Sequence, residues 1–118
     1  MTRYYMDLIG WQKAMDLVTE IYRLTKKLPK EEMSGLASQL RRAAVSIPSN
    51  IAEGQGRLSK GEFRVFLGNA RGSLSELETQ IMIAKNLEYI DAPEATVLLE
   101  MASEVGRILN GLIASMKK

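Results

Sequence analysis

The feature that most constrains this chain is the spacing of apolar residues between Gly35 and Glu53. These residues recur at intervals of three and four: Leu36, Leu40, Ala43, Ile47 and Ile51. The spacing places them on one face of an α-helix, and that face must be buried against another element. Pro48 lies in the same stretch, where a helical proline costs roughly 3 kcal/mol. The sequence therefore predicts a helix over residues 34–53 that is kinked or broken near Pro48.

Three further stretches show helical periodicity, and they predict helices over about residues 8–27, 60–88 and 93–116. Residues 1–7 are expected to form a short arm. No stretch has the alternating pattern of a β-strand. These patterns predict one all-α domain over residues 1–118, which is an up-down-up-down four-helix bundle with short connections.

The expected helix ends carry recognisable capping residues. Ser34 is the expected cap of the second helix. Ser59, followed by Glu62, and Asp91, followed by Glu94, have the spacing of capping boxes for the third and fourth helices. Gly54 and Gly56 are expected to end the second helix in a tight turn with positive φ.

A polar stripe runs beside the apolar face of the second helix, and a second polar stripe follows the third helix. The first comprises Gln39, Arg42, Ser46, Asn50, Glu53 and Arg57; the second comprises Glu62, Asn69, Ser73, Glu76 and Gln80. We expect the two stripes to oppose one another, with Arg42 or Arg57 paired to Glu76 or Glu62. The alternative is a solvated flank held by ion pairs within each helix.

Glycines mark a different face of the third helix. Gly61, Gly68 and Gly72 point the same way as Val65 and Thr79. Each glycine costs close to 1 kcal/mol relative to alanine inside a helix. We therefore expect close packing of another backbone there, and we assign that backbone to a second subunit; the alternative is simple tolerance of glycine.

The chain contains neither cysteine nor histidine. This excludes disulfides, thiol nucleophiles, histidine-based triads and zinc sites with Cys or His ligands. No apolar run is long enough for a membrane span, and no signal peptide is indicated. We expect a cytoplasmic protein with no membrane partner, no metal and no other cofactor.

Charge is unevenly distributed along the chain, although the net charge is only +2. From Arg41 to Arg71 there are six basic residues against two acids, whereas from Glu76 to Glu104 there are seven acids against Lys85 alone. This asymmetry suits both self-association and an anionic partner.

Three blocks together carry a family resemblance: WQKA at residues 11–14, GLASQLRRAAVSIPSNIAEGQGR at 35–57 and ARGSLSELETQ at 70–80. The chain resembles the 23S rRNA intervening-sequence proteins, a four-helix-bundle family. The resemblance implies a left-handed bundle that assembles in bacteria into a ring, usually a pentamer. A similar bundle, the accessory variability determinant of diversity-generating retroelements, binds nucleic acid and a reverse transcriptase. The family's characteristic polar positions correspond to Arg41, Arg42, Ser46, Asn50, Glu53, Gly54, Gly56, Arg57, Ser73, Glu76 and Glu78.

The first functional hypothesis is a non-enzymatic homo-oligomeric scaffold that binds structured RNA, a ribonucleoprotein or another nucleic-acid-processing protein. Its phosphate contacts would be Arg41, Arg42, Arg57, Lys60, Arg64 and Arg71. Phe63 and Phe66 are interpreted as core residues, so no aromatic platform accompanies these charges. That pattern favours contact with the phosphate backbone over base stacking.

The second hypothesis is a protein-interaction or structural module without nucleic-acid binding. Its polar network or subunit interface would comprise Gln39, Arg42, Ser46, Asn50, Glu53, Arg57, Glu62, Ser73, Glu76 and Glu78. The third is an enzyme that uses the carboxylates of Glu53, Glu62, Glu76 and Glu78. Because no histidine, cysteine or nucleophile motif is present, we predict that the protein is not an enzyme.

Overall fold

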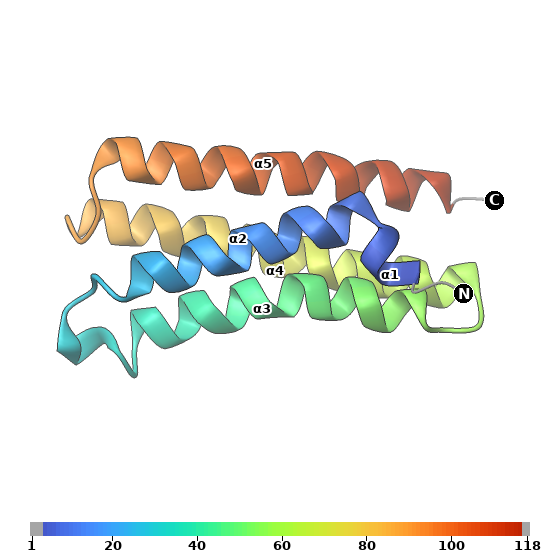
Figure 1. The fold of residues 1–118 in the computed structure, drawn as a ribbon, viewed down its shortest axis with the longest axis horizontal. Coiled ribbons are helices and arrows are strands. Elements are labelled where there is room, and N and C mark those ends of the chain that lie inside the picture. The colour runs from blue at the N-terminus through green and yellow to red at the C-terminus, as the bar shows by residue number, and fades with distance from the viewer. Residues whose placement is uncertain (1–3, 117–118) are drawn as a thin grey trace.

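The computed structural model describes residues 4–116, and four long α-helices account for most of them (Figure 1). These are α2 (Ile9–Thr25), α3 (Leu36–Gln55), α4 (Lys60–Asn86) and α5 (Ala92–Ser115). Successive long helices run in opposite directions, and the two chain ends lie at the same end of the bundle (Figure 1). The predicted all-α, up-down-up-down four-helix bundle is confirmed.

Two short helices were not predicted. α1 (Tyr4–Asp7) precedes the bundle, and the 3₁₀-helix η1 (Lys30–Glu32) lies in the first connection. The expectation of an arm is therefore wrong for residues 4–7, and residues 1–3 lie outside the described part. Tyr5 packs edge-on against Trp11 with ring centroids 5.5 Å apart, which ties α1 to α2.

α3 continues through Pro48 as one helix, so a break at this residue is wrong. Pro48 is itself buried, and Ile47 and Ile51 beside it are completely buried. Burial of each such isoleucine stabilises the fold by about 1.5–3 kcal/mol. Packing of this segment therefore offsets the roughly 3 kcal/mol that an internal proline costs.

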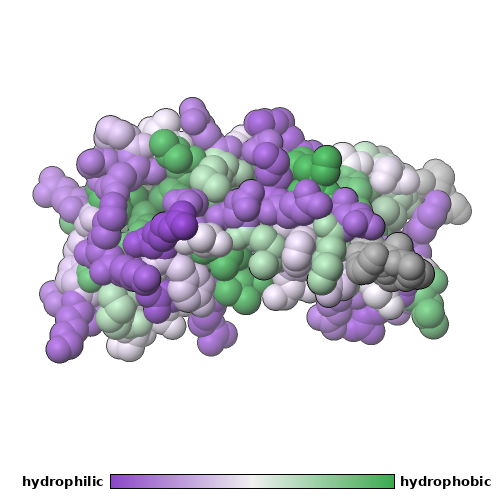
Figure 2. All heavy atoms as spheres, in the orientation of Figure 1, coloured by the Kyte–Doolittle hydropathy of each residue, from purple (hydrophilic) through white to green (hydrophobic). Residues whose placement is uncertain are grey.

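The core lies along the bundle axis and receives large side chains from all four long helices. Those that are completely buried are Leu17, Ile21, Leu40, Ile47, Ile51, Leu67, Leu77, Ile81, Val105 and Leu109. Hydrophilic side chains cover much of the face shown in Figure 2, and apolar side chains appear there in separate patches. In α3, the apolar spacing that predicts the helix also identifies its buried side, since Leu40, Ala43, Ile47 and Ile51 are all buried.

The predicted helix caps are found at Asp91 and Ser59 but not at Ser34. Asp91 Oδ1 accepts from the Glu94 amide at 2.8 Å, and the Glu94 carboxylate accepts from the Asp91 amide at 3.1 Å. Ser59 Oγ accepts from the Glu62 amide at 3.1 Å, but the reciprocal bond is replaced by Ser59 Oγ donating to Glu62 Oε1 at 3.3 Å. At the start of α3, Glu32 Oε1 rather than Ser34 accepts from the Leu36 amide, at 3.1 Å.

Gly54 and Gly56 do not form the predicted turn with positive φ. α3 continues to Gln55, Gly56 has φ −81°, and no glycine within residues 4–116 has a positive φ. Gly54 is buried, and a Cβ placed on it would lie 2.5 Å from Phe66 Cβ. The glycine is therefore needed for the close approach of α3 to α4.

The other three glycines selected from the sequence are open within a single chain. Among residues 4–116, a Cβ at Gly68 or Gly72 would have no neighbour within 4 Å, and one at Gly61 would meet only Ser59 Oγ at 3.9 Å. These residues therefore make no close helix contact inside the monomer. Their packing against a second subunit stays a prediction.

Candidate binding surface along α3

The two polar stripes meet where α3 packs on α4. Ser46 Oγ lies 2.8 Å from Ser73 Oγ, and Gln80 Nε2 donates to Gln39 Oε1 at 3.5 Å. Asn50 Nδ2 reinforces this layer by donating to the Ser46 carbonyl at 2.8 Å and to Ser46 Oγ at 2.9 Å. A line of hydrogen bonds therefore follows the α3–α4 contact.

The ion pairs expected between the stripes are absent from residues 4–116. Arg57 Nη2 contacts Glu53 Oε2 at 2.6 Å, and its guanidinium lies 4.7 Å from the Phe66 ring centre. This pairing agrees with the alternative interpretation, in which the stripe is a solvated flank held by ion pairs within one helix. Within the described chain, Arg42 is exposed and makes no ion pair or hydrogen bond, whereas Glu76 accepts a long bond of 3.4 Å from Gln80. Arg42 thus presents an uncompensated positive charge.

Gln80 is the main polar residue in the core of this contact. It is 4% exposed, and its Oε1 is buried without a hydrogen-bond partner among the described residues. A buried acceptor of this kind costs about 1–3 kcal/mol when it is unpaired. Sequence reasoning placed Gln80 on the polar stripe but did not predict its burial.

The six basic residues proposed as phosphate contacts do not form one patch. Arg41 and Arg42 lie in the first half of α3, whereas Arg57 and Lys60 lie about 20 Å further along the bundle, given a 1.5 Å rise per residue. Arg64 and Arg71 turn towards α5. Their partners are the Ile113 carbonyl at 3.4 Å and Asn110 Oδ1 at 3.0 Å, respectively.

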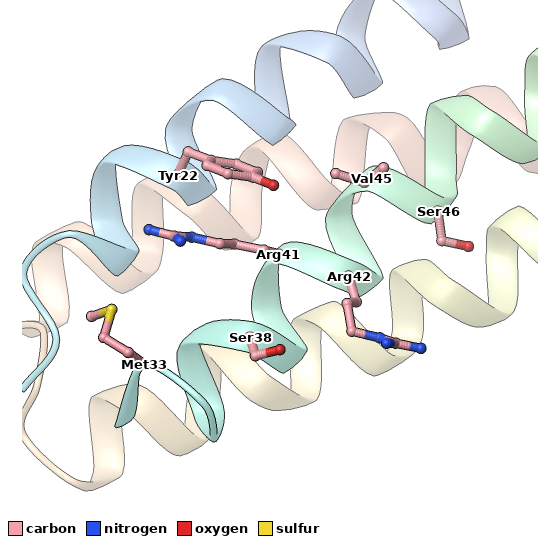
Figure 3. Close-up of a pocket in the computed structure, with 7 residues that line it drawn as sticks. All are labelled: Tyr22, Met33, Ser38, Arg41, Arg42, Val45 and Ser46. Atoms are coloured by element: carbon pink, nitrogen blue, oxygen red, sulfur yellow. The ribbon is translucent and has the colours of Figure 1, made fainter. Parts of the chain in front are cut away.

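A pocket of about 530 Å³ opens between α2 and α3 beside the first of these groups (Figure 3). It is lined by Tyr22, Met33, Ser38, Arg41, Arg42, Val45 and Ser46. No carboxylate belongs to this lining. Of the seven residues, only Arg41, Arg42 and Ser46 were selected from the sequence.

Arg41 is held in a defined position at this pocket. Its Nε donates to Thr25 Oγ1 at 2.7 Å, and the fully buried Thr25 hydroxyl donates to the Tyr22 carbonyl at 3.0 Å. The Arg41 guanidinium lies 4.8 Å from the Tyr22 ring centre, a cation–π contact. Tyr22 is 39% exposed. The expectation that no aromatic side chain accompanies the basic residues is therefore wrong here.

The groups with shifted pKa values lie away from this pocket. Lys27 donates to Glu94, and this hydrogen bond raises the pKa of Lys27. The same bond, together with that from the Asp91 amide, lowers the pKa of Glu94. The hydroxyl of Tyr89 donates to Glu32 Oε2 at 2.8 Å, which raises the pKa of Tyr89. Both contacts join elements that are distant in sequence, so their role is structural.

Residues 4–116 contain no cluster of three or more acidic side chains that could hold a metal ion. In the same part of the chain, no helix combines the length and the apolar character that crossing a membrane requires.

The protein is a four-helix bundle with a polar surface along α3. This surface combines the hydrogen-bonded α3–α4 layer with the arginine-lined pocket. The chain belongs to the 23S rRNA-intervening sequence protein family, whose sequence pattern matches residues 6–111. A solved structure from the S23 ribosomal protein family of Bacteroides thetaiotaomicron, a protein of unknown function, shares the fold with a TM-score of 0.83 and 24% identity. The match covers 89% of this chain and 98% of that chain. No curated protein matches the sequence.

Proposed function

We propose that this protein is a non-enzymatic homo-oligomeric scaffold that binds structured RNA or a ribonucleoprotein through basic residues of α3. The observation that carries the proposal is the pair Arg41 and Arg42, which line one pocket without a carboxylate. The names of the family and of its structural neighbour refer to ribosomal RNA and to ribosomal protein, which agrees with an RNA partner. The family has no known enzymatic activity.

A ring makes weak RNA contacts effective. Two arginines per subunit provide little affinity alone, but copies held on one scaffold act together and raise the effective concentration of each site. We propose a ring of five subunits, the number that the family resemblance implies. The outer face of α4 supports self-association, since it combines the open Gly68 and Gly72 with the exposed apolar residues Val65 and Ile83.

The salt dependence of RNA binding tests the proposal. Two phosphate contacts give a slope of about −1.4 in a plot of log affinity against log salt concentration for one subunit, or about sevenfold weaker binding between 50 and 200 mM salt. Replacing Arg41 and Arg42 together with glutamine should remove most of this slope. Arg107→Gln on α5 is the control, because Arg107 is exposed and its one hydrogen-bond partner among the described residues is Ser103. Absence of binding to several RNA and DNA species in dilute salt would contradict the proposal.

A protein-interaction module is the second candidate function. The uncompensated charge of Arg42 favours it, because an acidic residue of another subunit could pair with this charge. In that case Arg42→Ala should dissociate the oligomer, whereas Arg64→Ala should leave assembly intact. Under RNA binding through α3, Arg42→Ala should instead weaken the RNA complex without changing the subunit number, because Arg42 lines the pocket. Size-exclusion chromatography with light scattering on both variants separates the two functions.

A further inference from the structure

We propose that the pocket between α2 and α3 binds one unpaired nucleotide of an RNA. The base would stack on the Arg41 guanidinium, and the phosphate would be bound by Arg42 and the Ser38 hydroxyl. This inference rests on the proposed RNA-binding function and adds to it a site with its own ligand preference.

The size and lining of the pocket suit a nucleotide. Its volume of about 530 Å³ lies within the range of about 300–1,000 Å³ typical of small-ligand sites. Met33 and Val45 provide apolar surface for a base, while Ser38 and the two arginines provide donors for a phosphate. A ligand that is apolar at one end and anionic at the other matches this combination.

Arg41 offers a flat surface for stacking. One face of its guanidinium rests against Tyr22, and the side chain extends between Tyr22 on one side and Met33 and Ser38 on the other (Figure 3). RNA-binding proteins stack unpaired bases on aromatic rings and on arginine guanidinium planes. Because the Thr25 hydroxyl already holds Arg41 Nε at 2.7 Å, little side-chain entropy is lost when a base binds.

Arg42 lies where a phosphate can be bound separately from the base. Its side chain extends from α3 towards α4, away from Arg41 and Tyr22 (Figure 3). Arg42 has no ion pair within residues 4–116, so no carboxylate must be displaced. Ser46 is less available than Ser38, because its hydroxyl is already bonded to Ser73 and Asn50.

The geometry favours unpaired nucleotides over a duplex. A base inside a duplex is covered on both faces by its neighbours, so it cannot stack on a protein side chain without leaving the helix. A duplex can still contact Arg42 through its phosphates. The pocket therefore predicts tighter binding to RNA with an unpaired segment than to a blunt duplex.

Arg41→Lys is the most informative variant, because lysine keeps the positive charge and lacks the planar group. Fluorescence anisotropy would compare two RNA hairpins with the same stem, one blunt and one with a short unpaired 3′ tail. We expect the wild type to prefer the tailed hairpin by about fivefold or more, the usual effect of one stacked base. Arg41→Lys should abolish this preference and retain binding to the blunt hairpin. Arg107→Lys on α5 is the matched control, because it keeps the charge and lies outside the pocket lining, and it should behave as wild type.

The outcomes separate this inference from the proposed function. Equal, salt-dependent binding of both hairpins by the wild type would overturn the nucleotide site and leave RNA binding in place. Equal losses on both hairpins for Arg41→Lys, or no loss on either, would also overturn it. Absence of binding to any RNA would overturn both proposals.

Two competitors identify the source of the ligand. Free adenosine monophosphate should compete much more weakly than the tailed RNA, and equal competition would indicate a site for free nucleotides instead. Poly-glutamate should not reduce the preference for the tail. If it does so while sparing the blunt hairpin, the pocket binds an acidic protein segment and the nucleotide assignment is wrong.

Discussion

Replacing Gly54 with alanine tests the close approach of α3 to α4. The new Cβ would lie 2.5 Å from Phe66 Cβ and 3.0 Å from Phe63 Cδ1. Phe66 Cβ is fixed to the α4 backbone, so it cannot rotate away and the helices must separate. Alanine gains about 1 kcal/mol of helix propensity, while overpacking of a core costs about 1–3 kcal/mol. Because the contact is with a backbone-linked atom, the upper part of that range applies, and the net loss should be about 1–2 kcal/mol.

Thermal unfolding followed by far-UV circular dichroism measures this loss. For a domain of this size, it corresponds to a decrease in Tm of about 4–8 °C. Gly111→Ala is the matched control, because a Cβ at this exposed site on α5 meets no atom of the described residues within 4 Å. Its stability should rise by up to about 1 kcal/mol through helix propensity alone. The reasoning is refuted if Gly54→Ala raises Tm as Gly111→Ala does.

Three further predictions concern pH and assembly. The lowered pKa of Glu94 means that its pairing with Lys27 stabilises the fold above the ordinary value of 4.5 and is lost as the pH falls through the lower folded value. The Tm of Glu94→Gln should therefore fall less than that of the wild type on acidification through this range. The raised pKa of Tyr89 has the opposite effect, because the bond from Tyr89 to Glu32 stabilises the fold below pH 10.0 and is lost as the pH rises through the folded pKa. The Tm of the wild type should therefore exceed that of Tyr89→Phe at neutral pH. This difference in Tm should vanish in strong alkali. Gly72→Ala should leave the monomer folded but reduce the oligomer mass measured by light scattering; unchanged mass would show that this face is not an interface.

The helices and the core could be predicted from apolar spacing because each helix buries one continuous face. Leu40, Ile47 and Ile51 are completely buried, as their spacing indicates. Of the two alternatives at Pro48, the break is wrong because it was inferred from local backbone chemistry, whereas tertiary packing keeps the helix continuous. The kink stays a prediction. The cap of α3 was missed for a similar reason. Glu32, which accepts from the Leu36 amide, is also bound by Tyr89, 57 residues away in the sequence.

The candidate site could be predicted only where the residue pattern of each helix, taken by itself, fixes the position of a side chain. The rhythm of the polar stripes placed Ser46 opposite Ser73, since both follow the edge of a buried face. The stacking of Arg41 on Tyr22 depends on how α2 is aligned with α3, which neither helix specifies alone. The same holds for Gly54, whose necessity arises from a phenylalanine of another helix.

The hydrogen-bonded layer between α3 and α4 also means that the linker between these helices does not have to set their alignment. Gln39 and Ser46 are two turns apart on α3, and their partners Gln80 and Ser73 are two turns apart on α4, so sliding either helix by one turn would break both bonds. The hydrogen bonds between α3 and α4 thus fix the axial alignment of the two helices, and the linker around the fully exposed Leu58 is not needed to fix it. Since this linker and both chain ends lie at the same end of the bundle, the molecule is suited to circular permutation, with the old ends joined and new ones opened at the linker (Figure 1).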